Sequence, residues 1–319
     1  MNTRILYIFT RTPLHIGAGA SVGAIDQPIQ RERHTGFPII PASSLKGSFA
    51  DQWNATLHEE EADKDGKIKR VRVTKSGAIA EAAWLFGSDN DKPAFAGSLL
   101  FSEARVLAFP IRSAKGSYAW ITCPLMLQRA KRDGVINAEI LPTEPKDDEA
   151  IFKTDGPLAL GVKVKGVERS QVVLEEYTFT NIEAYPESLA KELAALLEDE
   201  LFKSIADRLV ILSNGMMSHF VSTTCEIAQH VRISDETGTA EEGGLFNQEN
   251  APSETLFYSV LTATKSRVPV GELKDKPFAE ALTAFENKLK EAHHTFQFGG
   301  DASTGLGFCT VTLNQKKGA

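Results

Sequence analysis

The chain has 319 residues, of which 42% are hydrophobic and 24% charged, so it can bury a sizeable core. Its formal net charge of −7 argues against a protein that coats nucleic acid through one large basic surface, but it leaves room for local basic grooves. We find no run of eighteen apolar residues and no secretory leader, and therefore expect a cytoplasmic protein without a membrane partner. The three cysteines, Cys123, Cys225 and Cys309, are too far apart to indicate a disulfide framework and should be buried.

In chain order, residues 4–10 are rich in β-branched and aromatic side chains and predict a strand that runs into a glycine-rich loop at Gly17. A helix should start near Pro41 with Ser43 or Ser44 as its N-cap. Its buried face is predicted from apolar residues at every fourth position: Leu45, Phe49, Trp53 and Leu57. The charged stretch 58–77 should be a mobile loop or insertion, and a short helix should end at Gly87.

Further strands are predicted over 98–111, 118–122 and 171–179. Leucine or isoleucine at every fourth position predicts one long helix over 186–212, which Asn214 and Gly215 should end. Glycines between residues 231 and 258 suit a projecting hairpin, followed by a helix over 277–289 and a strand over 308–313. This order predicts an α+β fold, with helices on one side of a sheet.

Two segments could carry chemistry. Residues 12–19 and 24–29 contain His15, Gly17 and Asp26, but Val22 and Pro28 exclude a dinucleotide-binding fingerprint. No phosphate-binding P-loop, metalloprotease pair or serine-hydrolase elbow is present either. By itself, Asp26 could simply form an Asx-type turn before Pro28.

The second segment is a loop near the C-terminus with Gly299, Gly300, Gly305 and Gly307. Four glycines in nine residues could turn backbone N–H groups toward a phosphate, or could only form a tight loop between helix and strand. Lys46, near a helix N-terminus, would be a matching cation for a sugar-phosphate backbone.

Together these residues resemble the RAMP superfamily and, more closely, the backbone subunit of the type III-B CRISPR Cmr effector complex. The resemblance rests on separate blocks in the same order: residues 12–17, 24–31, 36–47, 109–113, 119–124 and 300–308. It implies a single RAMP domain over 1–319 with insertions at 58–77 and 230–256. The fold would be a ferredoxin-like (RRM-like) palm with inserted helical elements and a projecting β-hairpin thumb.

The resemblance also implies the function. Copies of the chain would stack into a helical filament along a guide CRISPR RNA, beside other Cmr subunits. The thumb would enter the duplex of guide and single-stranded target RNA at regular intervals, and Asp26 would cut the target there. RNA contacts are assigned to His15, Gly17, Ser44, Lys46, Gly299, Gly300, Gly305 and Gly307. Relatives often have an aromatic and acidic pair where this chain has residues 246–249, so the resemblance assigns no catalytic residue there.

A single carboxylate supports phosphodiester cleavage best by holding Mg²⁺ or Mn²⁺, and we expect a weakly bound ion shared between Asp26 and RNA. His15 could be a general base, a contact to a guide phosphate, or a packing residue. Three other functions stay open: a scaffold subunit that grips the guide and never cuts, a metal-independent endoribonuclease that processes repeat RNA, and a small-molecule enzyme for which no cofactor motif is found.

Overall fold

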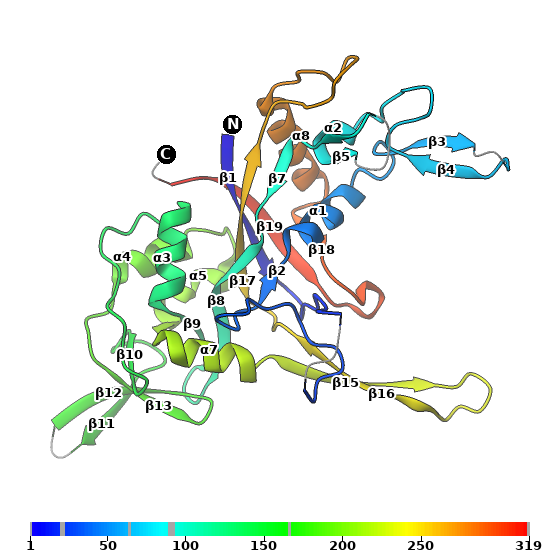
Figure 1. Cartoon of the computed structure of the whole chain (residues 1–319). Coiled ribbons are helices and arrows are strands. Elements are labelled where there is room, and N and C mark those ends of the chain that lie inside the picture. The colour runs from blue at the N-terminus through cyan, green and yellow to red at the C-terminus, as the bar shows by residue number, and fades with distance from the viewer. Residues whose placement is uncertain (1, 20–22, 63–64, 89–92, 165–166, 318–319) are drawn as a thin grey trace.

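One mixed β-sheet forms the centre of the molecule and joins strands from both ends of the chain (Figure 1). The computed structural model describes residues 2–19, 23–62, 65–88, 93–164 and 167–317. The strand order of the sheet is β11-β12-β13-β10-β14-β9-β8-β17-β1-β19-β18, with β2 beside β8 and β7 beside β17. Most neighbours are antiparallel, whereas β14 runs parallel to β9 and β10 parallel to β13. The mixed α and β architecture expected from the sequence is therefore present.

The strands of this sheet are β1 (Asn2–Thr10), β2 (Ile39–Ile40), β7 (Leu99–Phe101), β8 (Ala104–Ser113), β9 (Ser117–Thr122), β10 (Glu149–Phe152), β11 (Leu160–Val164), β12 (Val167–Leu174), β13 (Tyr177–Asn181), β14 (Leu209–Ile211), β17 (Leu256–Ala263), β18 (Thr295–Gln297) and β19 (Phe308–Gln315). Three further pairs form separate hairpins: β3 (Glu59–Ala62) with β4 (Ile68–Val71), β5 (Gly87–Ser88) with β6 (Phe95–Ala96), and β15 (Glu226–Ile233) with β16 (Ala240–Asn250).

The helices are α1 (Ala42–Asp51), α2 (Ala83–Phe86), α3 (Pro124–Asp133), α4 (Glu187–Ala194), α5 (Glu200–Lys203), α6 (Ile205–Arg208), α7 (Asn214–Thr223), α8 (Phe278–Glu291) and the 3₁₀ turn η1 (Ala302–Thr304). None of the helices in the described ranges has the length and apolar character needed to cross a membrane.

Strand β1 is buried on both faces, because successive side chains of a strand point to opposite sides of the sheet. Leu6 and Ile8 pack in one apolar cluster with Phe49 of α1, and Tyr7 packs in a second cluster with Phe202 of α5. Helices therefore cover both faces of the sheet, and the expectation of helices on one side only was wrong.

The predicted long helix over 186–212 is also wrong. It is divided into α4, α5 and α6, and residues 209–211 instead form strand β14 between β9 and β10. The carboxylate of Asp199 accepts a hydrogen bond from the N–H of Phe202 and starts a new helix there. A spacing of four residues also drifts by about 40° per step around a helix with 3.6 residues per turn, so six such positions cannot share one face.

Two smaller expectations also differ from the structure. Helix α1 begins at Ala42, and its N-cap is Pro41, with no side-chain hydrogen bond, so neither Ser43 nor Ser44 is the cap. The charged stretch 58–77 is not only a loop, because it contains the β3–β4 hairpin. By contrast, the burial of all three cysteines and the short helix before Gly87 are confirmed. The division into one domain with two insertions stays a prediction.

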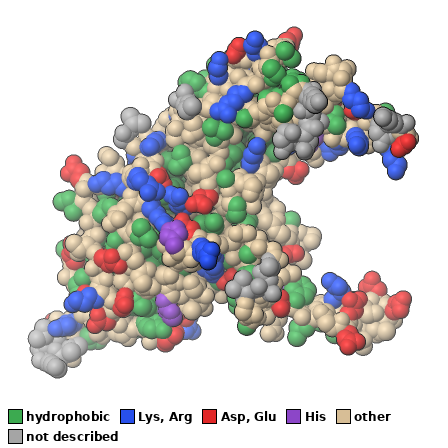
Figure 2. All heavy atoms as spheres, viewed as in Figure 1, with side chains coloured by type: hydrophobic (Ala, Val, Ile, Leu, Met, Phe, Trp, Pro, Cys, Tyr) green, Lys and Arg blue, Asp and Glu red, His purple; other side chains and the backbone are tan. Residues whose placement is uncertain are grey.

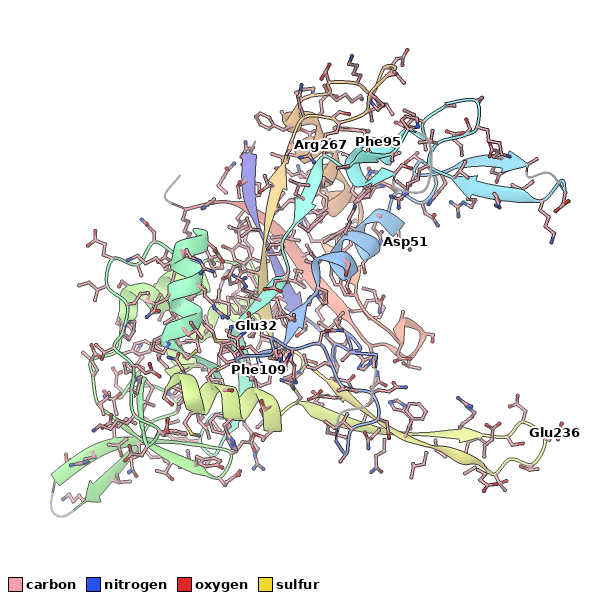
Figure 3. The ribbon with its side chains drawn as sticks, in the orientation of Figure 1. Glu32, Asp51, Phe95, Phe109, Glu236 and Arg267 are labelled. Atoms are coloured by element: carbon pink, nitrogen blue, oxygen red, sulfur yellow. The ribbon has the colours of Figure 1, made fainter. Side chains whose placement is uncertain are left out.

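Two hairpins project from the sheet on the same side of the molecule, β3–β4 near its top and β15–β16 at its bottom (Figure 1). Figure 2 shows the surface hollowed between these two arms. Figure 3 labels Glu236 at the tip of the lower arm and Asp51 at the end of α1, on the wall of the hollow. The segments that carry the predicted site meet between α1 and the base of the lower arm.

Candidate nucleic-acid interface

Asp26 lies on an exposed loop that is fixed to the base of the β15–β16 hairpin. The N–H of Asp26 donates to Asn247 Oδ1 at 2.8 Å, and Asp26 Oδ2 accepts from the N–H of Asn247 at 2.9 Å. The Asn247 side chain also donates to the carbonyl oxygen of Ala24 at 3.0 Å. Asn247 thus holds both the backbone and the carboxylate of Asp26, and among the described residues no group donates to the other oxygen, Oδ1.

The residue that follows Asp26 continues this contact by pairing with strand β16. Gln27 forms a parallel bridge with Gln248, because its N–H donates to Asn247 O at 3.1 Å and its carbonyl accepts from the N–H of Glu249 at 2.9 Å. Backbone hydrogen bonds on both sides of one residue fix its register. The position of Asp26 therefore depends on the hairpin.

Glu249 is the buried charge beneath this contact, with a relative exposure of 3%. Its Oε2 accepts from the N–H of Ile29 at 3.0 Å, and its Oε1 pairs with Arg31 Nη2 at 2.6 Å. Burial alone would lower the pKa of Arg31, but Cys225 and Glu249 together raise it above its usual value. A buried carboxylate needs such a partner, since an isolated charge is costly to remove from water.

His15 is buried beside Glu249. Its Nδ1 lies 2.7 Å from the carbonyl oxygen of Glu249. A carbonyl only accepts, so Nδ1 carries the proton, and Nε2 is the acceptor in the neutral ring. Nε2 faces Gly17, where an added Cβ would lie 3.1 Å away. The structure therefore brings His15, Gly17 and the Asp26 loop together.

The C-terminal glycine loop closes over His15. The N–H of Gly300 donates to the His15 carbonyl at 3.1 Å. Gly299 has a φ of +77°, and a Cβ there would come within 2.0 Å of the same carbonyl oxygen, so only glycine fits. Gly307, with a φ of +77°, approaches the Phe298 carbonyl equally closely. These glycines allow close backbone approach.

Three glycine amides of this loop are already engaged in hydrogen bonds within the protein. The N–H groups of Gly300, Gly305 and Gly307 donate to the carbonyls of His15, Ala302 and Pro13. They are therefore committed within the protein, and any RNA contact by these glycines must use other atoms. Their assignment as RNA-binding residues stays a prediction.

Helix α1 lies beside the glycine loop, since Phe49 packs edge-on against Phe298 with ring centroids 5.4 Å apart. Lys46 is exposed on this helix, and Ser44 is half-buried in its first turn. Within the described residues, Lys46 forms no ion pair. An unpaired ammonium beside an uncapped helix N-terminus suits an anionic ligand.

No group of three His, Cys, Asp or Glu side chains in the described part of the chain could hold a metal ion. The other acidic side chain nearby, Asp301, accepts from Gln248 Nε2 at 2.9 Å. Asp26 Oδ1 could therefore supply one ligand, and the remaining ligands would have to come from water or a bound phosphate. The donor set suits a shared ion better than a closed protein site.

Sequence reasoning assigned no role to Asn247 or Glu249, although both fix the Asp26 loop. Their sequence positions, 221 and more residues from Asp26, hide this contact. The only available signal was the departure of residues 246–249 from the pattern of relatives.

Comparison with known proteins gives a consistent result. The model of the RAMP superfamily matches residues 8–310. The CRISPR system Cmr endoribonuclease Cmr4 of Pyrococcus furiosus is 33% identical over 329 residues, covering 99% of this chain and 97% of the relative. A crystal structure of oligomeric Cmr4 from Pyrococcus furiosus superposes with a TM-score of 0.64 at 26% identity, covering 99% of this chain and all of that chain. A chain of the type III-B Cmr-beta complex bound to cognate target RNA shares the fold, with a TM-score of 0.64 at 20% identity over 98% of this chain and 97% of that chain.

Proposed function

The chain belongs to the RAMP superfamily, and we propose that it is a guide-RNA-binding backbone subunit of a type III-B CRISPR effector complex that cleaves complementary target RNA at regular intervals. Its partners would be guide RNA, single-stranded target RNA, other copies of itself and other Cmr subunits. In this proposal the central sheet and its helices form the ferredoxin-like palm, and the β15–β16 hairpin is the thumb.

The observation that carries the proposal is the attachment of Asp26 to the base of the projecting hairpin. An exposed carboxylate, one of whose oxygens accepts no hydrogen bond from any described residue, lies where a hairpin leaves the body of the protein. If the hairpin enters a guide–target duplex, the target phosphate at that step passes close to Asp26. One cut per subunit then follows from one hairpin per subunit, which explains regular spacing.

Cleavage requires attack on phosphorus by a 2′-hydroxyl or water, in line with the departing 5′-oxygen. Asp26 Oδ1 is free to hold a group that stabilises the charge developing on the phosphate. His15 Nε2, as the acceptor nitrogen of a neutral ring, could accept a proton or, when protonated, contact a guide phosphate. Its hydrogen bond to Glu249 fixes the orientation of the ring for either role.

Asp26 would hold Mg²⁺ or Mn²⁺ together with RNA phosphate oxygens, and the bound ion would neutralise phosphate charge. The support is the single unoccupied carboxylate oxygen and the lack of a closed ligand set among the described residues. Binding in the absence of RNA should accordingly be weak.

Guide binding should involve Lys46 and Ser44 on α1, beside the glycine loop. Contacts from an ammonium and from backbone groups go to phosphate and sugar and therefore tolerate any guide sequence. The affinity should fall as salt rises, because phosphate binding releases counterions.

The test is target-RNA cleavage by the reconstituted guide-loaded complex, with Asp26→Asn compared with wild type in Mg²⁺ and in EDTA. We expect regularly spaced products to disappear, by about 100-fold or more, in both the variant and EDTA, while guide binding persists. The matched control is Glu236→Gln, which removes a carboxylate at the far tip of the same hairpin.

Each alternative predicts a different result. Spaced products that survive Asp26→Asn would reduce the chain to a scaffold. A single cut in repeat RNA that persists in EDTA would indicate a metal-independent processing enzyme.

A further inference from the structure

An open groove of about 560 Å³ lies beside the base of the β15–β16 hairpin and takes no part in the Asp26 contacts. Its walls come from the facing ends of β8 and β9, from α5, from the first residue of β15 and from residues 252–254. Apolar side chains of Pro110, Ile111 and Leu201 contribute to the lining, and Leu201 is 44% exposed. A leucine left exposed in a groove favours a partner that covers it.

Two carboxylates in this groove have no cationic partner. Within the described residues, the side chains of Glu226 and Glu254 accept no hydrogen bond and form no ion pair. Burial raises the pKa of Glu226; burial, followed by the charges of Glu226 and Asp199, raises that of Glu254. Two like charges in a partly desolvated groove would be stabilised by a positive group from outside.

The backbone around the groove is held in an unusual conformation. Ser117, Glu175 and Glu254 have φ values of 71°, 50° and 63°, and they are three of the seven non-glycine residues with positive φ in the part of the chain that the structure describes. Glu254 is held by its N–H, which donates to Thr10 O at 2.7 Å, and by its carbonyl, which accepts from Trp120 Nε1 at 2.9 Å. Backbone strain of this kind concentrates where a surface has a function.

A complementary surface lies at the other end of the same strand. Strand β17 begins two residues after Glu254, and its eight residues lead to the loop 264–276, which projects at the top of Figure 1. Arg267 of this loop, labelled in Figure 3, is exposed and forms no ion pair among the described residues. Pro269 and Val270 beside it are also exposed, Val270 by 57%. The loop therefore offers an exposed guanidinium beside an apolar contact, which match the groove.

We propose that the groove receives the Arg267 loop of a second copy of this chain, so that Arg267 pairs with Glu226 and Glu254. The inference rests on the proposed function, which already places copies side by side, and it names the surfaces that meet. The two surfaces differ and lie at opposite ends of β17, roughly 26 Å apart along the strand. A contact of this head-to-tail kind can repeat from copy to copy, and it builds an open filament when its rotation does not close a ring.

The test is sedimentation velocity of the full chain, alone and on a guide RNA long enough for several copies. One variant carries Glu226→Lys and Glu254→Lys, and a second carries Arg267→Glu. Each alone should weaken self-association by at least about 30-fold, because like charges would face each other in a desolvated contact. The matched controls Glu291→Lys on α8 and Lys191→Glu on α4 reverse exposed charges outside the groove lining and should assemble like wild type.

Mixing the two variants gives the decisive result. The intact Arg267 loop of one variant fits the intact groove of the other, and the reversed loop fits the reversed groove, so the mixture should form long assemblies in which the two variants alternate. All three substitutions in one chain should restore long assemblies. Thermal melts check that each variant folds, and Arg267→Ala with Glu254→Gln provides a milder pair with the same expected direction.

Several outcomes would overturn the inference: variants that assemble like the controls, a mixture that assembles no better than either variant alone, or a wild-type chain that never self-associates. The inference would also fail if the groove variants still self-associated but no longer bound a different subunit of the complex. Guide binding and target cleavage are measured separately. If the wild type neither bound guide RNA nor cleaved target RNA, the proposed function would be wrong. Head-to-tail association of the wild type would still support the groove contact.

Discussion

The two projecting hairpins of this molecule are built alike but connected differently. In β15–β16 the last three residues of the second strand, Gln248, Glu249 and Asn250, are buried to 3% exposure or less and bind the Asp26 loop, Arg31 and His15. In β3–β4 the residues are mainly exposed, and two of the four cross-strand pairs join opposite charges, as in Glu60 opposite Arg70. One hairpin is anchored in the core, and the other is attached to the surface.

This difference indicates which hairpin should influence the site. Exposed cross-strand charge pairs are weak and screened by salt, so the β3–β4 arm can change without disturbing the body. The buried base of β15–β16 transmits the position of the hairpin to Asp26. The predictions below test this contrast.

The largest effect is expected from Glu249→Gln. The amide can still accept from Ile29, but Arg31 loses its buried partner, which should lower the free energy of unfolding by about 3 kcal/mol. Glu60→Gln on the other hairpin removes a carboxylate opposite Arg70 and should leave stability unchanged within error. Chemical denaturation measures both, and equal losses would contradict the contrast.

Two glycines with nearly equal φ test whether close backbone approach adds to the cost of an alanine substitution. Gly299 (φ +77°) faces the His15 carbonyl, whereas Gly66 (φ +76°), between β3 and β4, has open space. Gly299→Ala should cost about 2–4 kcal/mol from strain and clash, and Gly66→Ala about 1 kcal/mol from the left-handed conformation alone. If thermal unfolding shows the same loss for both, the glycine loop does not depend on its contact with His15.

Asn247→Ala should separate positioning from binding. The variant loses two side-chain hydrogen bonds to the Asp26 loop but keeps the backbone N–H that donates to Asp26. In the guide-loaded complex we expect kcat for target cleavage to fall about 10-fold to 100-fold with target affinity unchanged. Gln229→Ala, directly across the hairpin from Asn247, is the control. A change in affinity alone would indicate that Asn247 only contacts RNA.

The smallest expected effect is on the pH dependence of folding stability, and its sign differs between the two hairpins. Burial raises the pKa of Glu226 above 4.5, so its contribution favours folding below 4.5 and is lost as pH rises through the raised pKa. The N–H of Lys75 lowers the pKa of Glu61, so that contribution is present above 4.5 and is lost as pH falls through the lowered value. Relative to wild type, Glu226→Gln should therefore be slightly more stable at pH 7, and Glu61→Gln slightly less stable. Unfolding measured from pH 3 to 7 would refute this if both differences had the same sign.

Local patterns predicted those elements whose side chains follow one period throughout. The β-branched and aromatic side chains of residues 4–10 predicted β1, and the helix predicted over 277–289 is present as α8. Residues 186–212 were wrongly predicted to form one helix, because leucines at every fourth position suit a helix locally. Residues 209–211 nevertheless pair with β9 and β10, and this pairing outweighs helical preference.

The sequence by itself determined the family and the main strands, and it singled out Asp26, His15 and the glycine loop as candidates, because these lie in short segments that can be recognised without knowing their neighbours. Only the tertiary structure decided what holds them. Asn247 and Glu249 meet the N-terminal loop across more than 200 residues, and the loop amides turned inward to carbonyls instead of toward a phosphate. The physical reason is that hydrogen bonds and buried charges must find partners in space, and adjacency along the chain does not specify those partners.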